Sequence, residues 1–214
     1  EGYGTGNEKV LPIYTSMATA NNPKSTTKEV YDLIINDLTE SVELLATFNR
    51  GTVKHAIDKS VAQGLLSYAL SARGTNEDLR NVVTITDEII ASNKFKVTTA
   101  NEVVAQLDED GALLNPESGF NNVATPSWMW GVDLTLASDL DLVSWWGQVD
   151  LFTYSYASAG DPKIIDNSLF ETIKDSDVRK GQFDEDYWPI NKFFAPERRV
   201  DGQRYIVTDY VYMR

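Results

Sequence analysis

The chain has 214 residues, of which 42% are hydrophobic and 24% are charged, a composition typical of a folded globular protein. The 32 acidic and 19 basic residues give a net charge of −13, which argues against nucleic acid or an anionic membrane surface as a partner. Cysteine is absent and His55 is the only histidine, which excludes disulfides, thiol nucleophiles and the usual zinc sites.

The first predicted helix begins near residue 26, after a polar stretch rich in turn residues. The segment Thr26–Glu29 has the capping-box spacing, in which a threonine and a glutamate satisfy free backbone N–H groups. Apolar residues then recur every three or four positions and form one stripe: Val30, Ile34, Leu38, Val42 and Leu45. The opposite face is polar: Lys28, Asp32, Asn36 and Glu43. This pattern predicts an amphipathic helix.

Two further helices are predicted over residues 57–73 and 75–90. The expected apolar face of the second helix is Val61, Leu65, Tyr68, Ala69 and Ala72. Small residues allow a neighbouring helix to approach closely: Ala62, Gly64 and Ser67. Gly74 is a natural stop, and the next helix carries Leu79, Val82, Val83, Thr86, Ile89 and Ile90. The pair is a helical hairpin of the tetratricopeptide (TPR) type, although the strict repeat signature is absent.

Beyond residue 94 the periodicity weakens, and short segments such as Trp128–Val132 and Tyr205–Val207 resemble strands. We therefore expect a mainly α fold of TPR-like hairpins packed with long irregular loops and a few short strands. Residues 1–214 are expected to be part of one domain, with helices over 25–94 and a loop-rich, aromatic, ligand-facing region over 95–214. Both ends of the sequence resemble interior segments of a longer chain, so we expect a fragment of a longer protein.

The order of several segments from about residue 26 to the end resembles that of the SusD/RagB family of outer-membrane nutrient-binding lipoproteins. The first three are helical, and they resemble the family patterns vY..I..DL, A..aLLarvyL and A...a..vi: Val30–Leu38, Ala62–Leu70 and Asn81–Ile90. The later three resemble a D.R element, a lysine strand and the lead-in to a further helix: Ser176–Lys180, Asn191–Phe194 and Asp209–Arg214. Ser67 and Ala69 depart from the pattern, because bulkier residues are usual there.

This resemblance implies a mainly α, SusD-like fold and a protein that binds a glycan without catalysis. It implies delivery of an oligosaccharide or polysaccharide to a SusC-like, TonB-dependent transporter. It also implies an outward-facing position on the outer membrane, held by a lipid anchor on a cysteine that this chain does not contain. No apolar run approaches the roughly 20 residues that span a bilayer, so the only membrane contact expected is through that anchor.

Aromatic side chains are the candidate ligand platform, because their flat faces match the C–H face of a sugar ring. Trp128 and Trp130 would share one face of a strand, and we expect them in the core. Trp145 and Trp146 are adjacent, so they point in opposite directions on a strand and one is expected to be exposed. Hydrogen-bonding residues surround this pair. The predicted ligand-binding residues are Trp145, Trp146, Gln148, Asp141 and Tyr154.

Two alternatives stay open: a helical-repeat module that contacts another protein, and a carbohydrate-active enzyme. An enzyme needs two convergent carboxylates, and three lie near the tryptophans: Asp139, Asp141 and Asp150. Acidic residues are so frequent here that a solvated loop is the preferred interpretation, and no catalytic residue is assigned. The acidic runs 108–110 and 184–186 favour turns over calcium sites. No cofactor is expected, and calcium at such a run stays an open alternative. His55 is interpreted as a capping or packing residue.

Overall fold

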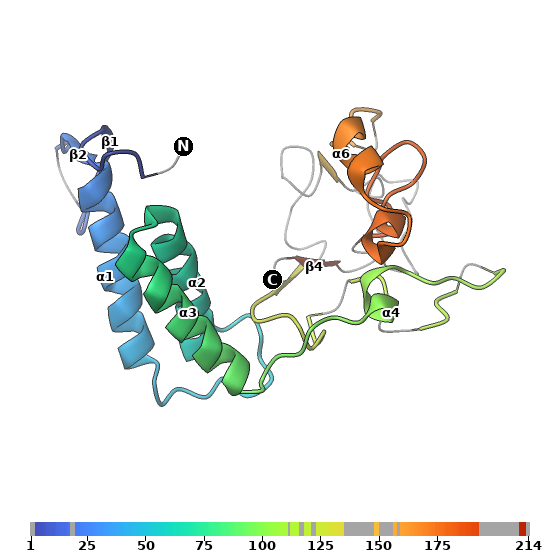
Figure 1. The fold of residues 1–214 in the computed structure, drawn as a ribbon, viewed down its shortest axis with the longest axis horizontal. Helices are drawn as coiled ribbons and strands as arrows, with labels where there is room; N and C mark the ends of the chain where they lie inside the picture. Colours follow the sequence, from blue (N-terminus) through green and yellow to red (C-terminus); the bar gives the residue numbers. More distant parts are fainter. Residues whose placement is uncertain are drawn as a thin grey trace. The chain divides into compact units, whose positions relative to one another are not determined.

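A computed structural model of the chain (Figure 1) divides it into two compact units, Glu1–Phe95 and Lys96–Arg214. The residues described are 3–17, 20–110, 112–115, 118–120, 123–134, 148–149, 156–157, 159–192 and 210–212. Each unit is considered by itself. None of the helices in these residues is long and apolar enough to cross a membrane.

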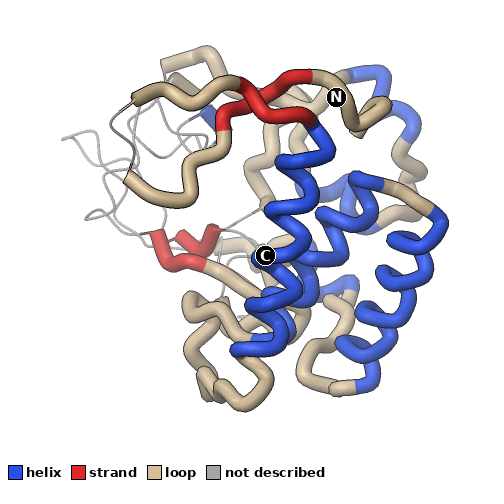
Figure 2. Tube along the Cα trace, turned by 90° about the vertical axis from the view of Figure 1, so that its left-hand side faces the viewer, coloured by secondary structure: helices blue, strands red, loops and turns tan. Residues whose placement is uncertain are grey.

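The first unit is a helical layer with a small β-ribbon at one end (Figures 1 and 2). Strands β1 (Lys9–Pro12) and β2 (Lys24–Thr26) pair antiparallel and lead directly into helix α1 (Thr27–Leu44). Helices α2 (Lys59–Arg73) and α3 (Asn76–Ala91) follow, and α2 packs against both α1 and α3. The three predicted helices and their order are therefore confirmed.

The start of α1 is fixed by the predicted capping box. The Thr26 hydroxyl accepts the Glu29 N–H at 3.1 Å, and the Glu29 carboxylate accepts the Thr26 N–H at 2.7 Å. The loop before β1 satisfies two more amides at this helix start, because the N–H groups of Thr27 and Lys28 donate to the carbonyls of Glu8 and Gly6 at 2.8 and 2.9 Å. The N-terminal loop is thus part of the helix cap.

Helix α2 is capped by a buried carboxylate at one end and a glycine at the other. Asp58 accepts the Val61 N–H at 3.0 Å and pairs with Arg50 at 3.2 Å, with only 6–8% of either side chain exposed. Gly74 ends the helix in the left-handed conformation (φ 71°) and donates to the Leu70 carbonyl at 2.8 Å. The stop at Gly74 is confirmed. His55 is exposed, and the capping role suggested for it belongs to Asp58.

The predicted inner face of α2 is only partly correct. Val61 is buried as expected, but Tyr68 is 76% exposed, and Leu65 and Ala72 are exposed as well. The other buried side chains follow a neighbouring face: Ala62, Gln63, Leu66, Ser67 and Leu70. Because α2 packs against both α1 and α3, this face combines small side chains with two leucines.

A polar network joins all three helices. Arg73, in the last turn of α2, donates to both carboxylate oxygens of Asp78 at 2.6 and 2.8 Å and to Asp32 of α1 at 3.3 Å. Asp78 is buried and also accepts the Thr75 N–H at 3.2 Å, which completes a capping box at the start of α3. Each oxygen of Asp78 has a donor, so its charge is compensated inside the layer.

The second unit has little regular structure in its described part: helix α4 (Ala100–Val103), helix α6 (Asn167–Thr172), the 3₁₀ helix η2 (Val178–Gln182) and one two-stranded sheet. Strand β3 (Val132–Leu134) pairs antiparallel with β4 (Tyr210–Tyr212). The strand expected at 128–132 is wrong, because residues 128–130 form a bend and the strand starts at Val132. The one expected at 205–207 lies outside the described residues.

Trp128 anchors the described core of the second unit. Its ring is fully buried, meets Phe120 edge-on at 5.1 Å between ring centroids, and has Val123 packed against this pair. The expected core position of Trp128 is confirmed, while Trp130 is half-buried. Phe120 is also tied to α4, since its N–H donates to the Glu102 carbonyl at 3.2 Å.

Replacing Asp78 by asparagine tests the polar network. We expect Asp78→Asn to lower the free energy of unfolding by about 3 kcal/mol, because it leaves Arg73 without its main charge partner. Urea denaturation measures the change. The control is Asp32→Asn, which removes a half-exposed partner of the same arginine and is expected to cost less than about 1 kcal/mol. Equal losses in the two variants would contradict the central role of Asp78.

Acid provides a second test of the same group. Hydrogen bonds from Arg73 lower the pKa of Asp78 from 3.8 to about 2, so the carboxylate stabilises the fold fully above pH 3.8. This contribution is lost as the pH falls through about 2, when the folded protein takes up the proton. We expect unfolding free energy to fall between pH 4 and 2, and to fall less steeply in Asp78→Asn. Parallel pH profiles would exclude Asp78 as a source of the slope.

Candidate functional site

The ligand residues predicted from the sequence lie almost entirely outside the described residues, and these are Trp145, Trp146, Asp141 and Tyr154. The carboxylates weighed for catalysis, Asp139 and Asp150, lie outside as well. Gln148 is described and half-buried, and its backbone carbonyl accepts the Lys163 N–H at 2.6 Å. The aromatic site therefore stays a prediction.

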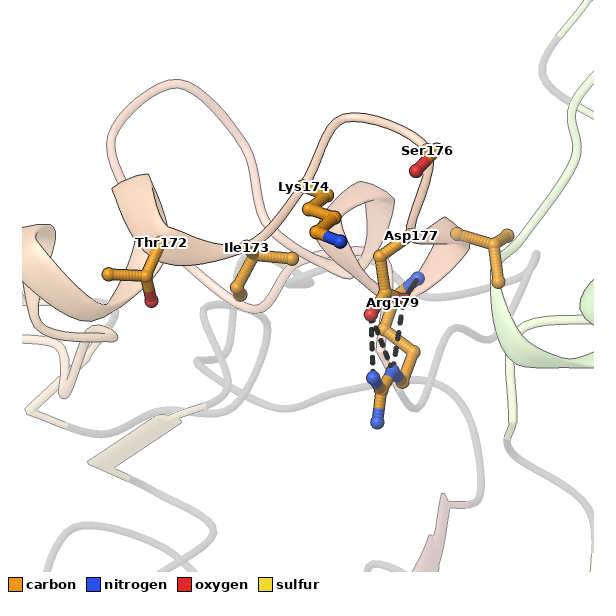
Figure 3. Close-up of a pocket in the computed structure, with 7 residues that line it drawn as sticks. Thr172, Ile173, Lys174, Ser176, Asp177 and Arg179 are labelled. Atoms are coloured by element: carbon orange, nitrogen blue, oxygen red, sulfur yellow. Dashed lines mark hydrogen bonds and ion pairs between the residues drawn. The ribbon is translucent and has the colours of Figure 1, made fainter.

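An open pocket of about 700 Å³ lies between the end of α6 and the start of η2 (Figure 3). It is lined by Thr172, Ile173, Lys174, Ser176, Asp177, Val178 and Arg179. Its volume falls within the range of small-molecule sites. The lining includes Ser176–Arg179, most of the segment that resembles the family D.R element.

The aspartate and arginine of this element form one rigid unit. Asp177 caps η2 by accepting the Arg179 N–H at 3.0 Å, and the same carboxylate accepts the Arg179 guanidinium at 2.6 and 2.9 Å (Figure 3). The hydrogen bonds from the Arg179 side chain, with its backbone N–H, lower the pKa of Asp177 to about 2 and keep it ionised. The Asp177–Arg179 pair holds the guanidinium at the rim of the pocket. The two-residue spacing of the D.R element places both side chains close enough to pair.

An aromatic cluster beside the pocket joins α6 to the residues that follow η2. Phe170 of α6 meets Phe183 and Tyr187 edge-on, with ring centroids 6.1 and 5.1 Å apart. The Lys180 ammonium lies 4.9 Å from the centre of the Phe170 ring and donates to Asp175 at 2.7 Å. The sequence analysis missed this cluster, although the grouping of aromatic residues between 170 and 188 was a visible signal.

The acidic runs considered for calcium act as turns. The Asp108 carboxylate accepts the N–H groups of Asp110 and Ala112 at 3.0 and 2.8 Å. Asp184 does the same for Asp186 and Trp188 at 3.0 and 2.8 Å. Among the residues that the structure describes, no group of three histidine, cysteine or acidic side chains is arranged to hold a metal ion. The turn interpretation of both runs is confirmed.

Comparison with known proteins gives one informative likeness. No protein-family model matches the chain, and no curated protein matches it. Its structure matches the crystal structure of a SusD-like carbohydrate binding protein from Bacteroides vulgatus ATCC 8482, with a TM-score of 0.60 and 26% sequence identity. The match covers 84% of this chain and 34% of the other, so the chain spans about a third of that protein's length.

The resemblance inferred from motif order is therefore confirmed by structure. The fold is mainly helical with packed helix pairs and a short two-stranded sheet, and it is SusD-like. In the described part, the D.R element is a capped turn on the rim of a pocket. The lysine strand expected over 191–194 is not seen at its start, where Asn191 and Lys192 lie in a turn. Phe193 and Phe194 are outside the described residues.

Removing the Asp177 carboxylate is expected to loosen the pocket rim. In Asp177→Ala the Arg179 amide loses its acceptor, so its hydrogen exchange, followed by NMR, becomes faster. Asp175→Ala is the matched control, because it removes the partner of the Lys180 ammonium but no acceptor of a backbone amide. Unchanged exchange at Arg179 in the first variant would show that the cap does not hold the turn.

Proposed function

We propose that the chain is part of a cell-surface protein that binds an oligosaccharide or polysaccharide for uptake and catalyses no reaction on it. The observation that carries this proposal is the structural likeness to a SusD-like carbohydrate binding protein over 84% of the chain. The two units would then be parts of one SusD-like domain. Binding, rather than turnover, is the function that the described residues support best.

The described carboxyl groups with a resolved pKa shift have structural roles and do not act as the acid of a glycosidase. A glycosidase needs one carboxylic acid with a raised pKa as its proton donor. Hydrogen bonds instead lower the pKa of every described carboxyl group with a resolved shift: Glu8, Glu29, Asp78, Glu102, Asp166, Asp175 and Asp177. These groups stay ionised at neutral pH and are occupied as caps and ion-pair partners.

The proposed glycan platform is the tryptophan pair Trp145 and Trp146. A ring face buries the apolar side of a sugar at little cost in side-chain entropy, because tryptophan has only two rotatable side-chain bonds. Gln148, Asp141 and Tyr154 would supply hydrogen bonds to the sugar hydroxyls. The pair follows β3 by about ten residues, in the segment that most enriches the chain in aromatic rings.

We further propose that the bound glycan passes to a SusC-like, TonB-dependent transporter, and that a lipid anchor holds the whole protein on the outer face of the outer membrane. One feature of the first unit supports a contact with another protein. The apolar stripe of α3 is wider than the face packed on α2, and its outer residues Leu79, Val83 and Ile90 are 47–72% exposed. The same stripe supports the second candidate function, a helical module that binds another protein.

Fluorescence titration tests glycan binding and its site together. We expect saturable quenching of tryptophan emission by one class of oligosaccharide, with no hydrolysis products. In Trp145→Ala or Trp146→Ala the dissociation constant should rise by about tenfold or more, because a stacked ring contributes about 1–3 kcal/mol by analogy with base stacking.

The control for this titration is Trp188→Phe, which removes one tryptophan elsewhere in the second unit and keeps an aromatic ring. Its dissociation constant is expected to stay unchanged. Binding that survives both alanine changes would move the site away from the tryptophan pair and keep the function. Absence of binding across neutral and acidic oligosaccharides would contradict glycan binding itself.

A further inference from the structure

The lining of the pocket between α6 and η2 differs in charge from the chain as a whole. Two cations, Lys174 and Arg179, and one anion, Asp177, line it, so the formal charge of the lining is +1 (two minus one). The whole chain carries −13. Two further acids are close in sequence without lining the pocket, Glu171 and Asp175, and Asp175 is paired with Lys180 at 2.7 Å.

The two cations differ in their hydrogen bonds and ion pairs. Asp177 accepts hydrogen bonds from Nε and one terminal nitrogen of Arg179 (Figure 3). The second terminal nitrogen, Nη1, has no hydrogen-bond partner among the described residues. Lys174 is exposed, and in the described part of the chain its ammonium has neither a hydrogen bond nor an ion pair. The pocket thus has an oriented guanidinium and an uncommitted ammonium.

The backbone beneath these groups is held firmly. The Lys174 carbonyl accepts the Asp177 N–H at 2.9 Å, and the Asp177 carbonyl accepts the Lys180 N–H at the same distance. Apolar side chains, Ile173 and the 40% exposed Val178, lie in the same lining. A ligand with an apolar face and one negative group would match both kinds of surface.

We propose that this pocket binds an acidic sugar unit, a hexuronic acid, within the glycan that the chain recognises. The carboxylate of the sugar pairs with Lys174 and the outer edge of Arg179, and the C–H face of the ring lies on Ile173 and Val178. The inference rests on the proposed glycan binding and specifies the ligand class. The net negative charge of the chain opposes it only weakly, because charges more than about 8 Å away are screened at physiological ionic strength.

Calorimetric titration of the full chain with trigalacturonic acid tests the proposal, and the methyl-esterified trisaccharide is the matched ligand without charge. We expect the acid to bind and the ester to bind about tenfold more weakly or not at all. Lys174→Gln should raise the dissociation constant for the acid about tenfold, since a charge-assisted hydrogen bond is lost. Lys96→Gln, the same charge change at another exposed lysine of the second unit, should leave it unchanged.

Each outcome decides the matter. The pocket is supported if binding of the acid weakens in Lys174→Gln, is unchanged in Lys96→Gln and declines with added salt. Equal binding of acid and ester, or no effect of Lys174→Gln, overturns it. Binding of a neutral glycan through the tryptophan pair without any binding of the acid overturns the pocket and keeps the proposed function. Failure of all glycans to bind removes both.

Discussion

The packing of the three helices in the first unit depends on the buried carboxylate of Asp78. It caps α3, receives the guanidinium of Arg73 from α2, and through that arginine is connected to Asp32 of α1. An uncompensated charge in this position would cost several kcal/mol, so the three helices must stay in the register that brings its donors together. Apolar contacts supply the bulk of the stability, while this ion pair specifies the arrangement.

An aspartate also caps the start of three other described helices. Asp58 caps α2, Asp166 caps α6 and Asp177 caps η2, each accepting a backbone N–H with its side chain. Asp108 and Asp184 do this in turns. Many acidic side chains of the protein therefore accept backbone N–H groups of their own segment. At the start of a helix, their negative charge also complements the helix dipole. An acidic composition in this molecule is a property of its loops and caps, and is weak evidence for catalysis.

Binding residues are often carried by irregular segments that a rigid scaffold positions. The described pocket follows this rule, since a capped 3₁₀ turn and an aromatic cluster hold an Asp–Arg pair and a lysine at the surface. The structural likeness to a carbohydrate binding protein gives these loops their proposed purpose. The proposed ligand class follows from the chemistry of the pocket, because cations favour acidic groups and aliphatic side chains favour the C–H face of a sugar ring.

The sequence by itself determined the three helices, the capping box at Thr26 and the stop at Gly74, because these signals act within a few residues. It also determined the order of motifs that the structural likeness confirmed. The inner face of α2 and the bend at Trp128 were decided by tertiary structure, since burial depends on which neighbours arrive and periodicity carries no record of them. The pocket is lined by one continuous segment, 172–179, and the contacts of Phe170 with Phe183 and Tyr187 beside it were visible only in the tertiary structure. Local hydrogen bonds depend on short segments, whereas the burial of a side chain depends on residues that are distant in the sequence.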